Sequence, residues 1–140
     1  MQFKKQVQDL MNYPVKTLGR NDELLLADSI MRTERIRHLP VLDDSARVVG
    51  IVSQRDLFFN ALVRALGFGT TTRERTLSTI LVKDVMTEDV VTTTPETLVM
   101  TAAQVMVDRK IGCLPVVSGE TSIGMLSESD VVSAVARGDL

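Results

Sequence analysis

Two pairs of polar residues have the spacing and surroundings of a small anion-binding site. Ser53 and Asp56 follow one short apolar segment, and Ser127 and Asp130 follow another with the same separation of three positions. In a capping box, such a hydroxyl and carboxylate bind free backbone N–H groups at the start of a helix. The same helix end attracts phosphate, because its N–H groups and its dipole end are positive. The two motifs therefore predict helix starts that are either only capped or also bind a phosphate-bearing ligand.

Basic residues near these motifs could supply the opposite charge. Arg37 and His38 are adjacent, and Arg55 stands inside the first Ser-x-x-Asp motif. A guanidinium binds phosphate through two hydrogen bonds, and an imidazole beside it can carry a positive charge. All three residues would also fit an ordinary solvated surface, with Arg55 as an exposed residue of the first helical turn. Both interpretations stay open at this point.

Catalytic machinery is not visible in the sequence. The chain has one histidine, His38, and one cysteine, Cys113, which leaves no Cys-rich or His-rich set of metal ligands. A Cys-His nucleophile would need a third orienting group and an oxyanion hole, and neither is recognisable. A Walker A sequence and a GxGxxG turn are also absent. We therefore expect no enzymatic activity and no bound metal.

The chain contains an internal repeat. With a shift of 75 positions, ten of the thirty-four residues at 9–42 are identical to those at 84–117, where chance would give about two. Segment 9–11 (Asp-Leu-Met) then aligns with 84–86 (Asp-Val-Met), and 36–41 with 111–116, each ending in Leu-Pro-Val. A shift of 74 aligns Gly-Ile-Val-Ser-Gln-Arg-Asp at 50–56 with Gly-Met-Leu-Ser-Glu-Ser-Asp at 124–130. The sequence thus encodes two copies of one structural unit.

Each copy is predicted to fold as β-α-β-β-α, which gives an α/β (α+β) protein. Apolar residues at helical spacing predict the first helix of each copy, and Thr94 with Pro95 is expected to begin it in the second copy. The second helices are expected to start near Arg55 and Ser129, and the last one to end at Gly138. The expected strands are 15–18, 39–42 and 48–52 in the first copy, and 90–93, 114–117 and 123–126 in the second.

The boundaries of the two copies follow from the same alignment. We expect one repeat at 7–66, a linker at 67–81 that is polar and mobile at 70–75, and a second repeat at 82–137. Residues 1–8 are expected to form a short helix beside the second copy. Halves of this size bury little surface alone, so the two copies are expected to pack together around a pseudo-twofold axis.

The order of these motifs resembles the CBS domain, and two in tandem resemble a CBS pair, or Bateman module. The resemblance covers nearly the whole chain, and its motifs are specific because they occur twice in the same order. It implies a regulatory module that binds an adenosine-type ligand in a cleft between the repeats and that pairs into homodimers. The ligand would be AMP, ADP, ATP or S-adenosylmethionine, acting as a regulatory ligand rather than a tightly bound cofactor.

The resemblance also implies roles for particular residues. Asp56 and Asp130 would accept hydrogen bonds from ribose hydroxyls, with Ser53 and Ser127 beside the phosphate. Arg37 and His38 would hold phosphate, and we expect them to reach the site whose carboxylate is Asp130. The second copy has Gly112-Cys113 instead of the basic pair, so two sites would be unequal. Residues around the adenine would be Val15, Thr17, Ile36, Thr87, Val90, Thr92 and Ile111, whose apolar members fit ordinary core positions equally well.

Composition limits the partners. With 44% hydrophobic and 24% charged residues the chain is typical of a globular domain, and its net charge of −2 does not favour nucleic acid. Apolar runs are far shorter than the ~20 residues of a membrane span, and no secretory signal precedes the first repeat. Together with the lone cysteine, these features predict a cytoplasmic location.

An alternative interpretation is a ligand-free module that dimerises or docks on an unknown regulated protein. It rests on a surplus of apolar residues after the first Ser-x-x-Asp motif. These residues are Leu57, Phe58, Phe59, Ala61, Leu62, Leu66 and Phe68.

Overall fold

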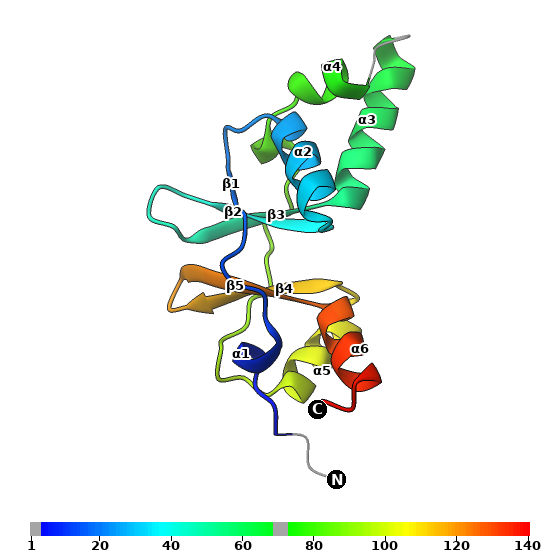
Figure 1. Cartoon of the computed structure of the whole chain (residues 1–140). Helices are drawn as coiled ribbons and strands as arrows, with labels where there is room; N and C mark the ends of the chain where they lie inside the picture. The colour runs from blue at the N-terminus through cyan, green and yellow to red at the C-terminus, as the bar shows by residue number, and fades with distance from the viewer. Residues whose placement is uncertain (1–3, 69–72) are drawn as a thin grey trace. The chain divides into compact units, whose positions relative to one another are not determined.

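The computed structural model describes residues 4–68 and 73–140, which form two compact units (Figure 1). Lys16–Val90 form one unit, called here the continuous unit. Met1–Val15 and Val91–Leu140 form the other, called here the split unit. The first nine residues of each repeat therefore belong to the unit of the other repeat. Residues 7–15 belong to the unit of the second repeat, and residues 82–90 to the unit of the first.

The continuous unit has a three-stranded sheet with order β1-β2-β3. Strand β1 is parallel to β2, which is antiparallel to β3, and the helices lie on one side of the sheet (Figure 1). Its elements are β1 (Leu18–Gly19), α2 (Leu24–Glu34), β2 (His38–Leu42), β3 (Val48–Ser53), α3 (Gln54–Phe68), α4 (Arg73–Ser78) and the 3-10 helix η1 (Val82–Asp84).

The split unit repeats this plan with a shorter sheet. Strands β4 and β5 are antiparallel, and Thr93 makes one parallel bridge to Val116 at the position that β1 has in the continuous unit. Its elements are α1 (Val7–Leu10), α5 (Val99–Arg109), β4 (Cys113–Ser118), β5 (Thr121–Ser127) and α6 (Glu128–Ala136).

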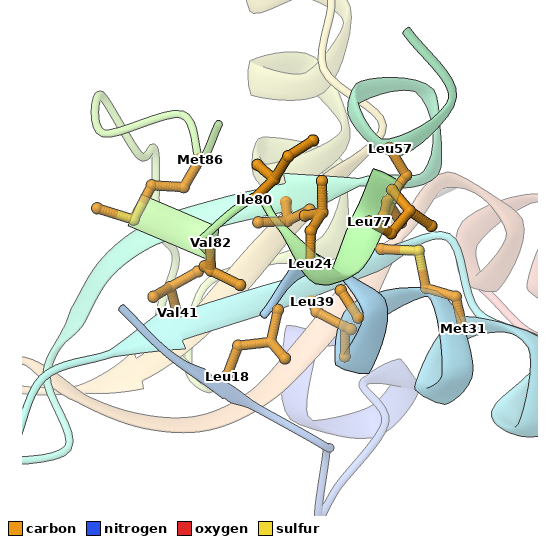
Figure 2. Packing of buried hydrophobic residues seen from close by; sticks show 12 residues of the cluster. Leu18, Leu24, Met31, Leu39, Val41, Leu57, Leu77, Ile80, Val82 and Met86 are labelled. Atoms are coloured by element: carbon orange, nitrogen blue, oxygen red, sulfur yellow. The ribbon is translucent and has the colours of Figure 1, made fainter. Parts of the chain in front are cut away.

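Each unit has its own hydrophobic core. In the continuous unit, side chains from the sheet, from α2 and α3 and from the segment around η1 pack together (Figure 2). Leu77 and Ile80, which lie between the repeats in sequence, are fully or almost fully buried there. In the split unit, Val7 of α1 is fully buried beside residues of α5, β4 and β5. The first residues of each repeat, together with linker residues before the second, thus complete the core of the other repeat.

A glycine lies three residues before the serine of each Ser-x-x-Asp motif, and close packing requires it at both positions. A Cβ on Gly50 would lie 2.5 Å from Sδ of Met86, and a Cβ on Gly124 would lie 2.8 Å from the carbonyl oxygen of Asn12 and 3.0 Å from Sδ of Met11. The repeat-matched methionines therefore pack on the two glycines as core residues. A side chain at Gly124 would push the backbone of Asn12 away from the sheet, whereas one at Gly50 would displace the side chain of Met86.

The predicted α+β pattern is confirmed, but the start of each copy is corrected. The first strand is Leu18–Gly19 rather than 15–18, and at 90–93 only the bridge of Thr93 remains. The helix expected to begin at Thr94 and Pro95 begins at Val99, with Leu98 as its N-cap. The intervening carbonyl groups of Pro95 and Thr97 instead accept hydrogen bonds from the N–H groups of α1 and its flank, at 3.0 and 2.8 Å.

The connecting segments also differ from expectation. The short helix expected at 1–8 is instead α1 at Val7–Leu10, with residues 1–3 outside the described residues, and it belongs to the unit of the second copy, as predicted. Within the stretch expected to be polar and mobile, residues 70–72 lie outside the described residues, whereas Arg73 begins helix α4. The second helices begin one residue earlier than expected, at Gln54 and Glu128. Gly138 has φ +68° and ends the last helix as predicted.

Candidate functional site

The first Ser-x-x-Asp motif forms a corner between β3 and α3, called here the Asp56 corner. The backbone N–H of Asp56 donates to Ser53 Oγ at 3.1 Å, and the N–H of Ser53 donates to Asp56 Oδ2 at 2.9 Å. This is the reciprocal arrangement of a capping box, so the capping interpretation is confirmed. Among the described residues nothing donates to the second oxygen, Asp56 Oδ1, and the side chain is half-buried. One carboxylate oxygen therefore remains available to a ligand.

The basic pair lies beside this corner in the same unit. His38 is directly opposite Ser53 in the antiparallel register of β2 and β3, and the N–H of Gln54 donates to the carbonyl oxygen of Arg37 at 2.8 Å. Side chains of directly opposed residues are separated by about 5 Å at Cβ. Arg55 is exposed on the first turn of α3. The expected approach of the pair to Asp130, which belongs to the split unit, stays a prediction.

The second motif forms a matching corner between β5 and α6, called here the Asp130 corner. The N–H of Ser127 donates to Asp130 Oδ2 at 2.8 Å, and the N–H of Asp130 donates to Ser127 Oγ at 3.3 Å. The hydroxyl of Ser127 also lies 2.8 Å from Asp130 Oδ2 and 2.9 Å from Ser129 Oγ. This helix start is therefore capped like the first, with a denser set of hydrogen bonds.

Asn12 is a functional candidate that the sequence analysis missed. Its Nδ2 donates to both oxygens of Asp130, at 3.1 and 3.0 Å. In the repeat alignment Asn12 corresponds to Thr87, so the only available signal was a mismatch between the copies at this position. Contact between residues 12 and 130 depends on the exchange of the leading segments, which the alignment did not reveal.

The residues expected around the adenine are divided between the units. Thr17, Ile36, Thr87 and Val90 belong to the continuous unit, and Val15, Thr92 and Ile111 to the split unit. Ile36 and Ile111 each pack against the core of their own unit, which agrees with their interpretation as core residues. The three threonines are exposed and the two valines are half-buried, so they remain candidates for ligand contact.

Cys113 is a core residue. It lies opposite Ser127 in the register of β4 and β5, and its side chain is buried. Burial, with a smaller contribution from the charge of Glu128, raises the pKa of the thiol to about 12. Because the thiolate is the reactive form, such a thiol is inert near neutral pH.

The searches for a metal site and for a membrane span gave no candidate. In residues 4–68 and 73–140, no three His, Cys, Asp or Glu side chains gather as metal ligands. Over the same part of the chain, no helix combines the length and the apolar character needed to cross a bilayer.

Comparison with known proteins identifies the fold. A solved structure of AcuB from Vibrio cholerae, assigned to acetoin utilization, is 32% identical with a TM-score of 0.76, over 94% of this chain and 90% of that chain. CBSX2, solved in complex with AMP, is 25% identical with a TM-score of 0.77, over 97% and 99% of the two chains. Both are similar to this protein along nearly their whole length.

Curated relatives are longer than this chain. Homoserine O-acetyltransferase from Methanosphaerula palustris is 29% identical over 133 residues, which are 94% of this chain but 24% of that enzyme. The chain thus spans about a quarter of the length of this relative, namely its CBS part. The family model of the CBS domain matches residues 7–62 and 82–137. The resemblance seen in the sequence is therefore confirmed: the chain belongs to the CBS domain family and carries two copies of the domain.

Proposed function

We propose that the protein is a regulatory module that binds an adenine-containing nucleotide such as AMP, ADP, ATP or S-adenosylmethionine. The observation that carries the proposal is the Asp56 corner, where among the described residues nothing donates to Asp56 Oδ1. This oxygen lies at the N-terminus of α3, whose first turn carries Arg55 and whose Gln54 N–H donates to the carbonyl oxygen of Arg37. The structure of CBSX2 with AMP supports the ligand class. No catalytic role is proposed for any residue.

The chemistry of the corner suits a nucleotide. The carboxylate of Asp56 would accept hydrogen bonds from the ribose hydroxyls, which are donors that a bare phosphate or an apolar ligand lacks. The phosphate would lie toward the N-terminus of α3, where the helix dipole favours an anion. Arg55 and the Arg37-His38 pair would add charge-assisted hydrogen bonds. The same carboxylate chemistry is present at Asp130, and the sequence analysis assigned the basic pair to that residue.

Regulation would follow from a shift in population. A ligand changes the balance between two conformations only to the extent that it binds one of them better. A ligand that contacts β2, β3 and α3 at the same time would favour the conformation in which these three elements are arranged as in the Asp56 corner. The regulated activity would reside in another protein or another domain.

A thermal-shift panel tests the proposal. The wild type, Asp56→Ala and Asp130→Ala are heated with adenine and guanine nucleotides and with S-adenosylmethionine. At about 100 times its dissociation constant a ligand adds about 2.7 kcal/mol, which is several degrees for a domain of this size. We expect a shift with at least one adenine ligand that is lost in one of the two variants. Asp44→Ala, which removes one negative charge from an exposed position, is the control. A folded wild type with no shift would overturn the proposal.

A second candidate function is dimerisation or docking without a ligand. On α3, Phe58, Phe59 and Leu62 are 60%, 64% and 49% exposed, an unusual apolar density for one helix face. Leu57, which the sequence analysis placed in this surplus, is fully buried in the core, and Ala61 packs against it. The side chains of Leu66 and Phe68 lie outside the described residues. We propose that this face forms a homodimer contact.

Sedimentation velocity tests the dimer. The wild type is expected to sediment as a dimer at tens of micromolar, and the double variant Phe58→Ser/Phe59→Ser as a monomer. Val107→Ser, an exposed apolar residue on α5, is the matched control and should leave the dimer intact. A monomeric wild type would contradict the dimer, and a dimer that no nucleotide stabilises would favour the ligand-free function.

A further inference from the structure

The carboxylate of Asp130 is already occupied by donors from its own unit. Asn12 Nδ2 donates to Oδ1 at 3.1 Å and to Oδ2 at 3.0 Å. The backbone N–H and the hydroxyl of Ser127 both lie 2.8 Å from Oδ2. Three of these four contacts fall on Oδ2, which has two lone pairs, and one falls on Oδ1. A ribose diol that binds both oxygens of Asp130 would therefore have to displace a donor from Oδ2 and would compete with Asn12 at Oδ1.

The side chain most readily displaced is that of Asn12. The contacts from Ser127 belong to the capping box and help to start α6, whereas Asn12 reaches Asp130 from a separate segment. Asn12 is held in place by its backbone, which pairs with Met125 through two hydrogen bonds of 2.9 and 3.1 Å. Its amide therefore stays near the carboxylate and competes with any external donor.

The Asp56 corner has the same backbone arrangement without the competing side chain. Thr87 pairs with Ile51 through two hydrogen bonds of 2.9 and 3.0 Å, which matches the pairing of Asn12 with Met125. Among the described residues only the N–H of Ser53 donates to the carboxylate of Asp56. The segment that crosses each corner therefore differs at this position by one side chain, an amide at position 12 against a hydroxyl at position 87.

We propose that Asn12 determines which corner binds the nucleotide, by acting as an internal competitor for Asp130. The ligand then binds at Asp56, and the Asp130 corner is closed unless Asn12 moves or is replaced. This inference rests on the proposed function, because it concerns the site of the same adenine ligand. It assigns to Asn12 a role in specificity that is independent of direct contact with the ligand.

Isothermal titration tests the assignment, with AMP, ATP and S-adenosylmethionine as probes. The wild type is expected to bind one ligand per chain, and Asp56→Ala to lose it. Asn12→Thr copies the residue of the other corner and should tighten the Asp130 site by about tenfold or more, the usual effect of hydrogen bonds to a charged group. It should therefore bind two ligands per chain, and Asn12→Thr/Asp130→Ala only one. The reciprocal variant Thr87→Asn should weaken binding at Asp56 by about tenfold.

The outcomes separate this inference from the proposed function. If the folded wild type and Asn12→Thr bind none of the probes, the proposed function fails. If the wild type binds but Asn12→Thr shows the same stoichiometry and affinity, only the role of Asn12 is overturned. Loss of wild-type binding in Asp130→Ala instead of Asp56→Ala would overturn it as well. Asn12→Ser repeats the test with a smaller side chain, and circular dichroism verifies the fold of each variant.

Discussion

The Asp56 and Asp130 corners have the same motif, the same capping box and the same antiparallel pair of strands, yet they offer different surfaces to a ligand. At Asp56 one carboxylate oxygen is without a donor among the described residues, whereas at Asp130 both oxygens accept hydrogen bonds from Asn12. The difference comes from a residue 118 positions away in the sequence. In a duplicated protein, the copies of a motif can therefore differ in the hydrogen bonds of their carboxylates while the motif itself stays unchanged.

Alanine substitutions at Gly50 and Gly124 should give the largest difference between the units in the free energy of unfolding. Gly124→Ala is expected to destabilise the protein by about 3 kcal/mol, because the new Cβ would meet the carbonyl oxygen of Asn12 at 2.8 Å. Gly50→Ala should cost about 1 kcal/mol, since the flexible Met86 side chain can move. Urea unfolding measures both values. Gly19→Ala, whose Cβ would have 3.4 Å to its nearest atom, is the control, and equal costs for Gly50 and Gly124 would contradict the expectation.

The two carboxylates should differ next in their contributions to stability. Asp130→Ala removes the capping bonds and the two contacts with Asn12, and should destabilise the protein by about 2 kcal/mol. Asp56→Ala removes only the reciprocal cap and should cost about 1 kcal/mol. Urea unfolding without nucleotide measures the difference, and Asp44→Ala supplies the control for loss of charge. A greater loss of stability in Asp56→Ala than in Asp130→Ala would contradict the stronger hydrogen bonding assigned to Asp130.

Cys113, the first residue of β4, should give the split unit a characteristic loss of stability at alkaline pH. Burial raises the pKa of Cys113 from 9.0 to about 12, so the thiolate forms more easily in the unfolded chain. The contribution of this thiol to stability is complete below pH 9 and decreases as the pH rises toward 12. The urea midpoint of the wild type should therefore fall more steeply over this range than that of Cys113→Ala. If the urea midpoints of the two proteins fell equally with pH, the thiol would not be buried.

The turns of the two hairpins should give the smallest difference between the units, which concerns the dependence of stability on acidic pH. In the continuous unit, hydrogen bonds from the backbone N–H groups of Arg47 and Ser45 lower the pKa of Asp43 below 3.8. Its stabilisation is complete above pH 3.8 and is lost as the pH falls through the lower, folded-state pKa. The matching turn of the split unit has Gly119 at φ +64° instead. Asp43→Asn should remove a small part of the acid dependence of the urea midpoint, and an unchanged profile would contradict this.

Local patterns explain which parts of the fold could be predicted from the sequence. The capping boxes join residues three positions apart, and the paired strands are separated by short turns, so both are visible in a repeat alignment. Helix α4 was missed because its sequence is polar, while Thr76 and Leu77 are buried by packing against other elements. The helix expected at Pro95 was displaced because the carbonyl groups of this segment bind the backbone of α1.

The candidate site was predictable only as far as its chemistry is local. The sequence identified Ser53, Asp56, Ser127 and Asp130, and the structure places each of them at the start of a helix. It gave no sign that Asn12 reaches Asp130, because that contact requires residues 7–15 to fold with the second repeat. Long-range exchange of segments has no signature in hydrophobic periodicity.

The division of the chain into a continuous and a split unit also fixes an order of events during synthesis. All residues of the continuous unit have been made once Val90 has been added, so this unit can fold while translation goes on. Met1–Val15 are made before this unit but must wait for Val91–Leu140, and the ion pair between Lys5 and Asp139, at 3.4 Å, can form only after Asp139 has been added. A nascent chain stopped after Val90 would thus carry a folded unit preceded by residues around Val7, whose buried packing partners in the second repeat have not yet been synthesised.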